Sequence, residues 1–328
     1  MSLLLGVDGG GTKTVAALAT FEGQLVGVAR TGPSNPQSIG TLGAARAVRL
    51  AIDAALARAG GTESEIVASA FGIAGADFER GTALVARTIR GVGSFGRTFV
   101  DNDSLLVLRL GAPDFVGVGL VAGTGTNCVG RGSSGQRFQI GGMGHISGDL
   151  GSASDLATLA VREAWRQSDG RSNPTPLRAR VRDVFGTNDL EAIAAAWEED
   201  ATLVPRLVSV LFECARAEDG AALEILDFVG AQLAEAATTC ARGLGLDRPT
   251  IALGGSMLAT EGHEPLRRVV RRRICAALER AAVCGPSEHP VVGALLIAAD
   301  LMGATGFEAK ARSAARGMDF SKSVQAEE

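Results

Sequence analysis

The sequence predicts an α/β protein built from two duplicated domains that face each other across a cleft. Three observations support this fold class. The chain has 328 residues, about twice the length of a typical single domain. A short apolar strand that ends in a Gly/Thr turn and is followed by a returning strand occurs twice, near residue 8 and near residue 123. Long Ala-rich segments with helical periodicity separate the strands.

The first domain is expected to span residues 1–112, with glycine or an acid at the end of each strand. Its opening apolar run is typical of a strand buried on both faces, and Glu22-Gly23 predicts a hairpin between the next two strands. A Gly/Pro/Ser/Asn-rich loop then precedes a helix that Gly60-Gly61 ends. The expected elements are strands Leu3–Val7, Thr14–Thr20 and Gln24–Arg30, a loop over 31–38, a helix Thr41–Arg58, a strand Glu65–Ile73, a helix 79–90, a strand Arg97–Val100 and a helix from Ser104.

The second domain is expected to span residues 113–289 and to contain a helical insertion. A helix over 290–303 is expected to pack back on the first domain, and residues 304–328 to form a polar, frayed tail. The expected elements are strands Phe115–Ala122, Cys128–Arg131 and Arg137–Ile140, helices over 151–168, 177–185, 189–197, 202–216 and 220–243, a strand Thr250–Leu253, and helices over 264–282 and 290–303.

Composition excludes several classes of protein. Lys plus Arg number 32 and Asp plus Glu 36, so the formal charge of −4 offers no basic surface for nucleic acid. No apolar run approaches the ~18 residues of a membrane span, and the N-terminus does not resemble a signal peptide. Five cysteines without a C-x-x-C pair fit neither a disulfide framework nor a zinc finger. We therefore expect reduced thiols and a cytoplasmic protein.

The first turn, Asp8 to Thr14, has the chemistry of a phosphate site. Glycines after a strand let backbone N–H groups approach an anion, Thr12 adds a hydroxyl and Lys13 a charge. Asp8 could hold hydrated Mg²⁺. Because the turn leads into a strand, it is neither a Walker A loop nor a Rossmann turn. A glycine-rich hairpin without a ligand explains this turn equally well when it is taken alone.

The second turn, Gly123 to Asn127, repeats this logic, with Thr124 between two glycines. Two such turns at equivalent places favour a clamp on a polyphosphate over a pair of plain hairpins. A third glycine pair, Gly254-Gly255 before Ser256, follows a buried strand. It would permit a purine or ribose to pack on bare backbone, although a close strand–helix turn explains it as well.

Two further segments carry acids. In Asp101-Asn102-Asp103 a carboxylate at the end of the central strand could take a proton from an attacking hydroxyl, although an acid before a helix is also a common N-cap. Residues 141–152 combine three glycine turns with His145 and Asp149, a pattern that could bind a polar ligand. The three histidines are interpreted as structural groups.

The ordered set DGGGTKT, VDND, AGTGTN, GGMGHISGDLGS and LGGS resembles the N-acetylglucosamine kinase branch of the BadF/BadG-type ATPase family, in the sugar kinase, actin and Hsp70 superfamily. The resemblance extends to about residue 302, and GTGTN followed by GGxGHxxGDxGS is its specific part. It implies duplicated RNase H-like (actin-like ATPase) domains with a nucleotide and sugar cleft between them. It also implies ATP and Mg²⁺ as cofactors and an amino sugar phosphorylated on its 6-hydroxyl. We further expect a homodimer and no membrane or nucleic-acid partner.

The resemblance also implies roles for individual residues. Asp103 matches the catalytic base, with Asp101 a weaker candidate. The residues implied to bind nucleotide are Asp8, Gly10, Thr12, Lys13, Gly123, Thr124, Gly254, Gly255 and Ser256, with Asp8 binding Mg²⁺ through water. The residues implied to contact the sugar are Asn35, Asp103, Thr126, Asn127, Gly142, Met143, Gly144 and Asp149.

Two departures from the family pattern concern the sugar. The compared kinases often carry Trp where this chain has Met143, and Glu where it has Leu150. Met143 removes a stacking surface, so glucosamine or another amino sugar stays open as the substrate. An ATPase activator of a radical dehydratase, with a shared iron–sulfur cluster, is an alternative of another class, but the five cysteines lack a shared glycine-rich loop. A non-catalytic sugar sensor would be expected to lose Asp103 or a phosphate turn.

Overall fold

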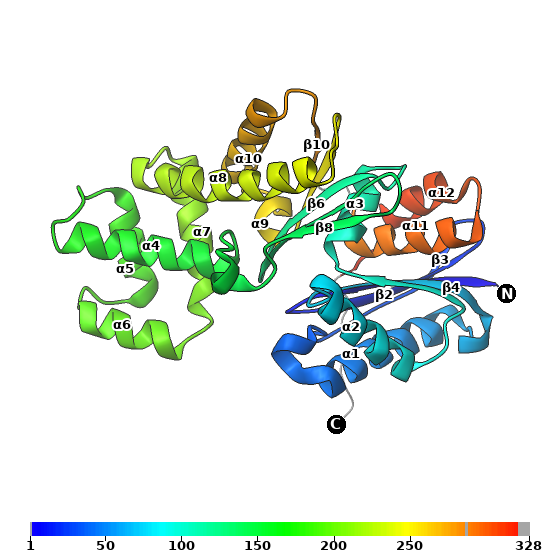
Figure 1. Ribbon diagram of the computed structural model, residues 1–328. Coiled ribbons are helices and arrows are strands. Elements are labelled where there is room, and N and C mark those ends of the chain that lie inside the picture. The colour runs from blue at the N-terminus through cyan, green and yellow to red at the C-terminus, as the bar shows by residue number, and fades with distance from the viewer. Residues whose placement is uncertain (1, 286–287, 321–328) are drawn as a thin grey trace.

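The computed structural model describes residues 2–285 and 288–320 and contains two five-stranded sheets that lie side by side (Figure 1). In the first sheet the strand order is β3-β2-β1-β4-β5. β1 pairs antiparallel with β2 and parallel with β4, and β2 and β3 form the predicted hairpin. The strands are β1 (Leu3–Gly9), β2 (Thr14–Thr20), β3 (Leu25–Thr31), β4 (Ile66–Ile73) and β5 (Arg97–Asp101).

The second sheet repeats this topology in the order β8-β7-β6-β9-β10. β6 pairs antiparallel with β7 and parallel with β9, as β1 does with β2 and β4. The equal strand order and directions confirm the predicted α/β fold with duplicated sheets. The strands are β6 (Gly117–Ala122), β7 (Thr126–Arg131), β8 (Arg137–Ile140), β9 (Thr250–Gly254) and β10 (Ala282–Cys284).

Helices pack on both faces of each sheet. α1 and α2 pack on one face of the first sheet, while α3, α11 and α12 enclose a core against the other face. The helices are α1 (Pro36–Ala59), α2 (Phe78–Val92), α3 (Ser104–Gly111), α4 (Ala153–Ser168), α5 (Pro176–Phe185), α6 (Leu190–Glu199), α7 (Leu203–Arg216), α8 (Gly220–Gly243), α9 (Ser256–Ala259), α10 (Glu264–Ala277), α11 (Pro290–Met302) and α12 (Phe307–Ala315), with 3₁₀ turns at Glu63–Glu65 and Gly144–Ser147.

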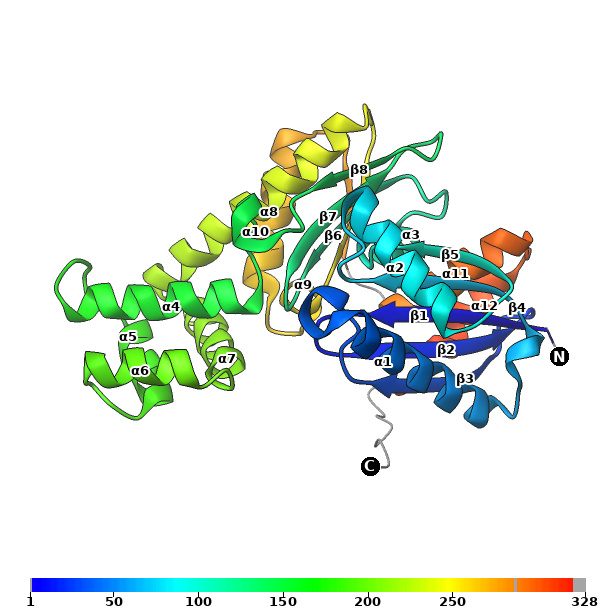
Figure 2. The same cartoon turned by 60° about the horizontal axis from the view of Figure 1, so that its bottom comes forward.

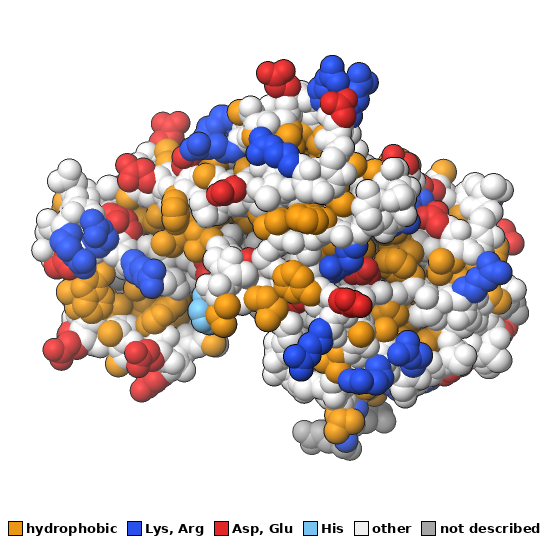
Figure 3. Space-filling view, in the orientation of Figure 1, with side chains coloured by type: hydrophobic (Ala, Val, Ile, Leu, Met, Phe, Trp, Pro, Cys, Tyr) orange, Lys and Arg blue, Asp and Glu red, His pale blue; other side chains and the backbone are white. Residues whose placement is uncertain are grey.

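The inserted helices extend the second sheet's side of the molecule. α8 and α10 pack against each other, and α8 also contacts β6, β7 and β8. α4 to α7 pack mainly on one another and project away from both sheets (Figures 1 and 2). The apolar core of the insertion is continuous with the core against β6 and β9 of the second sheet. The space-filling view shows a notch between the inserted helices and the first sheet's side of the molecule (Figure 3).

Two helices tie the sheets together. α3 follows the first sheet in the chain but packs on β6 and β9 of the second, while α11 follows the second sheet but packs on β1, β2 and β4 of the first. The approach is close: a Cβ on Gly119 would lie 1.9 Å from the carbonyl oxygen of Ser104, and one on Gly293 2.2 Å from that of Leu106. This packing fixes the N-terminus of α3, and with it Asp103, between the two sheets.

The structure corrects two of the predicted elements. The helix predicted over 264–282 ends at Ala277, and the chain then forms β10, a strand of 3 residues that is too short to show a period. The frayed tail predicted from Gly303 instead contains α12, whose Phe307 and Ala311 are buried on α11. Residues 321–328 of that tail lie outside the described residues. Within the described part of the chain, none of the helices has the length and apolar character needed to cross a membrane.

Candidate active site

A cavity of about 920 Å³ lies where the turns at the strand ends of both sheets converge. This volume is in the range of small-molecule sites in proteins. Every residue predicted to bind nucleotide or sugar lines this cavity except Asp149. The lining residues from that set are Asp8, Gly10, Thr12, Lys13, Asn35, Asp103, Gly123, Thr124, Thr126, Asn127, Gly142, Met143, Gly144, Gly254, Gly255 and Ser256.

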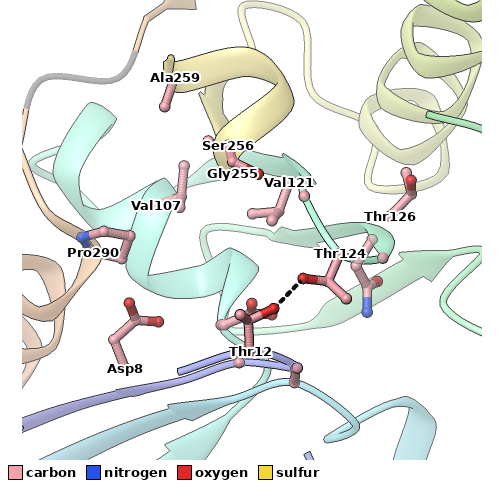
Figure 4. A pocket seen from close by; sticks show the side chains of 18 of the residues that line it. Asp8, Thr12, Val107, Val121, Thr124, Thr126, Gly255, Ser256, Ala259 and Pro290 are labelled. Carbon is pink, nitrogen blue, oxygen red and sulfur yellow. Dashed lines mark hydrogen bonds between the residues drawn. The ribbon is translucent and has the colours of Figure 1, made fainter. Parts of the chain in front are cut away.

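The two Gly/Thr turns meet at the cavity floor. The hydroxyl oxygens of Thr12 and Thr124 lie 2.7 Å apart, one from each sheet (Figure 4). Each turn is closed by a backbone hydrogen bond, from Gly10 N to the Lys13 carbonyl oxygen and from Gly123 N to the Gly125 carbonyl oxygen, both 2.8 Å. The turns therefore bring the two threonine hydroxyl groups together in the cavity, beside glycine backbone that an anion could approach.

Asp8 lies in a buried environment that disfavours the charged form of its carboxyl group. Burial raises its pKa to about 6, and the nearby Lys13 ammonium only partly opposes this. His289 Nδ1, 3.8 Å from Asp8 Oδ2, brings no positive charge, because burial lowers the pKa of His289 to about 3. A divalent cation at Asp8 would offset the cost of the buried carboxylate.

The structure around Asp8 fits Mg²⁺ better than a cation held by protein alone. Among the residues that the structure describes, no group of three or more His, Cys, Asp and Glu could hold a metal ion. Mg²⁺ usually takes one or two carboxylates and completes its shell with water and phosphate oxygens. Asp8 beside the paired turns provides this kind of partial site.

Asp103 has the properties of a general base. It follows β5 at the first residue before α3, and its side chain does not cap that helix. Burial raises its pKa to about 7, and the negative charges of Asp8 and Asp77 add to the shift. A carboxyl group poised near neutrality can both accept and release a proton at physiological pH.

Asp101, the weaker candidate for the base, is engaged elsewhere. Its Oδ1 accepts a hydrogen bond from Arg137 Nε at 2.9 Å, and the side chain is not part of the cavity lining. Burial raises its pKa, while the Arg137 guanidinium lowers it. The geometry therefore favours Asp103 over Asp101.

The third glycine pair forms one wall of the cavity. Gly255 has φ +81°, and a Cβ there would lie 2.3 Å from the Ala122 carbonyl oxygen, so only glycine fits. Val107, Leu110 and Ala259 add apolar surface to the cavity lining. Figure 4 shows Val107 and Ala259 above Asp8, on the same side as Gly255 and Ser256. Flat apolar surface next to bare backbone suits a nucleobase. Val107 and Leu110 could not be predicted as lining residues, because apolar residues of α3 are indistinguishable in sequence from ordinary helix core.

The opposite end of the cavity is polar. Asn35 caps α1, where its Oδ1 accepts from Gln37 N at 2.9 Å, and Asn127 on β7 also lines the cavity. Thr126 Oγ1 is buried without a hydrogen-bond partner in the described part of the chain, so a ligand hydroxyl could satisfy it. Met143 is 50% exposed and borders this end.

Asp149 is not among the residues that line the cavity, and its predicted contact with the sugar stays a prediction. Its Oδ2 accepts hydrogen bonds from Gly142 N and Gly144 N, both 2.8 Å, and from Ser147 Oγ at 2.9 Å. The carboxylate thus organises the loop that carries Gly142 to Gly144. These donors belong to the same loop as Asp149, and a linear motif does not reveal such hydrogen bonds. Leu150 is partly buried against the helical core.

Sequence reasoning missed Asp77 and Gln37, which line the cavity beside the polar end. Asp77 follows β4, the parallel neighbour of β1 and β5. Because the carboxyl ends of parallel strands meet at one edge of a sheet, an acid there could have been suspected.

Comparisons with known proteins show the family of this chain. The chain belongs to the BadF/BadG/BcrA/BcrD ATPase family, whose model matches residues 5–298. It is 32% identical over 183 residues to an N-acetylmuramic acid/N-acetylglucosamine kinase of Clostridium acetobutylicum, covering 56% of this chain and 60% of that protein. It is 25% identical over 317 residues to an N-acetyl-D-glucosamine kinase of Dictyostelium discoideum, covering 90% of this chain and 97% of the relative.

A solved structure shows the same fold. The crystal structure of a candidate N-acetylglucosamine kinase from Chromobacterium violaceum has a TM-score of 0.69 at 27% identity, covering 90% of this chain and 99% of that chain. The resemblance to the BadF/BadG-type family and the actin-like fold that it implied are therefore both confirmed.

Proposed function

We propose that this protein is an ATP-dependent kinase that phosphorylates the 6-hydroxyl of an amino sugar, with N-acetylglucosamine as the preferred substrate. The observation that carries the proposal is the position of Asp103. A carboxyl group with a pKa near 7 shares one cavity with two converging phosphate-type turns and a polar end. The kinase names of the relatives support it, and they do not favour a dehydratase activator or a sugar sensor.

The reaction needs little covalent help from the protein. The sugar 6-oxygen attacks the γ-phosphorus, the bond from that phosphorus to the β–γ bridging oxygen breaks, and ADP leaves. Asp103 takes the proton of the 6-hydroxyl and returns it to solvent after transfer. The turns around Thr12 and Thr124 hold the phosphates and donate to oxygens on which charge develops. Mg²⁺, when bound at Asp8, neutralises phosphate charge.

The polar end favours an N-acetyl group over a free amine. An ammonium at C2 would need a carboxylate with spare acceptor capacity. Asp77 lines this end, but its oxygens already accept four amide hydrogen bonds, from Gln37, Asn102, Asn127 and Gln139. Neutral amide and hydroxyl groups such as Asn35 and Thr126 are suited to a neutral sugar. We therefore rank N-acetylglucosamine above glucosamine.

The cytoplasmic location and the homodimer remain parts of this proposal. Cys128, Cys214 and Cys240 are buried, free thiols, which suits a reducing compartment. Sedimentation velocity at micromolar concentration tests the dimer.

The experiment is a coupled ADP-release assay with ATP and MgCl₂ across N-acetylglucosamine, glucosamine, N-acetylmannosamine, N-acetylmuramic acid and glucose. We expect the highest kcat/KM for N-acetylglucosamine, and a loss of about 10²–10⁴ in rate for Asp103→Asn. Asp101→Asn is the matched variant and should retain turnover. A higher kcat/KM for glucosamine would contradict the sugar, and no sugar-dependent ADP release would contradict the kinase.

A further inference from the structure

Asp77 occupies an N-cap position without acting as a cap. It precedes α2 directly, where an Asp side chain usually accepts from the helix's first N–H groups, yet it makes no such bond. The residue is 6% exposed and lines the cavity. Because the buried Asp77 carboxylate accepts no hydrogen bond from the first N–H groups of α2, other donors must stabilise it.

Those groups are four side-chain amides. Oδ1 accepts from Asn127 Nδ2 at 2.6 Å, Asn102 Nδ2 at 3.0 Å and Gln139 Nε2 at 3.0 Å. Oδ2 accepts from Gln37 Nε2 at 3.1 Å. Gln37 and Asn102 belong to the side of the first sheet, whereas Asn127 and Gln139 stand on β7 and β8 of the second.

We propose that Asp77 is a positioning residue for phosphoryl transfer. Its carboxylate, which side chains from both sheets share, holds the turn that carries Asp103 and orients the Asn127 amide toward the sugar. The inference rests on the proposed function and names a part of the site that it leaves open.

Asp77 is connected to the base, Asp103, through Asn102, which is fully buried. Its Oδ1 accepts from Ser104 N at 3.0 Å and so caps α3, while its Nδ2 is held by Asp77. Asp103 lies between Asn102 and Ser104 in the chain, and both of these residues are held by hydrogen bonds. Removing the Asp77 carboxylate would release the Asn102 amide and loosen the turn that aims Asp103.

Asp77 is connected to the proposed sugar-binding end of the cavity through Asn127. Its Oδ1 accepts from Cys128 N at 2.9 Å and from Gln139 Nε2 at 3.2 Å, and its Nδ2 donates to Asp77. Gln139 is itself fixed, since its Oε1 accepts from Phe78 N at 2.9 Å. The plane of the Asn127 amide is therefore set, and its second N–H has one direction available.

Asp77 also acts through its charge. Its carboxylate adds to the raised pKa of Asp103, together with that of Asp8, while backbone N–H groups of Asp103 and Ser104 lower it. Of the cations nearby, Lys13 lowers the pKa of Asp8 through its charge, and Arg137 is paired with Asp101. A neutral side chain at position 77 should therefore lower the pKa of the base.

A purely mechanical brace between the sheets would not need Asp77. Arg137 on β8 already bonds Asp101 Oδ1 and donates from Nη2 to the Ala76 carbonyl oxygen at 3.1 Å. The two sheets stay linked at this point without Asp77, so its loss should affect catalysis more than the arrangement of the domains.

The test uses Asp77→Ala, the isosteric Asp77→Asn, and Asp219→Ala as the matched control. Asp219 is 5% exposed and caps α8, accepting from Ala222 N at 3.0 Å and Leu177 N at 2.9 Å, away from the cavity. Each variant is measured for thermal midpoint, kcat, KM for sugar and for ATP, and the pH profile of kcat/KM.

We expect Asp77→Ala to lower kcat about 10²-fold, the effect of a displacement near 1 Å. Its sugar KM should rise about 10-fold as Asn127 turns, while its ATP KM stays within about twofold. Asp77→Asn keeps one acceptor for the amides, so its kcat should stay within about 10-fold, with the acid limb of its profile at lower pH. Asp219→Ala should lose thermal stability and keep wild-type kinetics.

If Asp77→Ala, like Asp219→Ala, kept wild-type kcat and wild-type KM values, this result would overturn the inference. If Asp77→Ala does not fold, Asp77→Asn decides: a lowered acid limb supports the inference, and an unchanged limb overturns it. All rates are taken on the sugar that the wild type phosphorylates fastest. Failure of the proposed function therefore appears in the wild-type substrate panel, and failure of this inference appears in the ratio of variant to wild type.

Discussion

Lowering the pH should switch the enzyme off through Asp103. Burial and two neighbouring carboxylates raise the pKa of this group to about 7. A general base works in its ionised form, so kcat/KM should rise with pH up to about 7 and then level off. Two units below that value, at pH 5, about 1% of the enzyme carries the ionised base, and the rate should be about 100-fold below the plateau.

The assay is kcat/KM for N-acetylglucosamine between pH 5 and 9, measured by ADP release at saturating ATP and MgCl₂. The cation should keep Asp8, whose pKa burial also raises, ionised throughout this range. Asp103→Asn is the control, because its residual rate should lack the limb near pH 7. A wild-type limb near pH 4, or the same limb in Asp103→Asn, would refute the assignment of the base and the electrostatic account of its pKa.

Three further predictions concern binding and stability. A Cβ on Gly125 would contact nothing within 4 Å, and the residue lines the cavity. Gly125→Val should therefore fold normally and weaken ATP binding at least about 10-fold by filling space for phosphate, and unchanged affinity by calorimetry would count against this turn. Asp149→Ala removes the acceptor of the Gly142 and Gly144 N–H groups; the sugar KM should rise about 10-fold with ATP KM unchanged, and equal effects on both would exclude a local role. Phe307→Ala removes a ring that is 1% exposed beneath α12, so urea unfolding should show a loss of about 3 kcal/mol with kcat retained; a loss under about 1 kcal/mol would mean that α12 is not part of the core.

The strand-end turns could be predicted because their signal is local. An apolar run followed by glycines and threonines marks both the end of a strand and an approachable backbone, and the pattern occurs twice. The convergence of Thr12 and Thr124 at 2.7 Å follows from the equal topology of the two sheets. In such a case the local motif and the long-range geometry agree.

Asp77 could not be predicted from its surroundings in sequence. Ala74-Gly75-Ala76-Asp77 contains no motif, and its four partners come from positions 37, 102, 127 and 139. Asp149 could be placed in its loop by the sequence, but its hydrogen bonds to the N–H groups of that same loop could not be predicted. The direction of an acid side chain depends on competing donors that a linear pattern does not rank.

The errors at the C-terminus have a simple cause. β10 has 3 residues, and its strand conformation comes from pairing with β9 and not from its own composition. α12 looks polar, but Phe307, Ala311 and Ala315 recur at helical spacing and are buried on one face. A small apolar stripe in a charged segment is a weak signal until the surface that receives it, here α11, is known.

The central claim is that Asp103 directs the phosphoryl group of ATP to the sugar 6-hydroxyl. The most direct measurement is ³¹P and ¹³C NMR of the product formed from ATP, MgCl₂ and N-acetylglucosamine by the wild type and by Asp103→Asn at equal concentration. The account predicts a phosphate ester coupled to C6 with the wild type, and a product yield at least about 10²-fold lower with Asp103→Asn in the same time. Inorganic phosphate without a sugar ester, an ester at another carbon, or equal yields from the two proteins would contradict it.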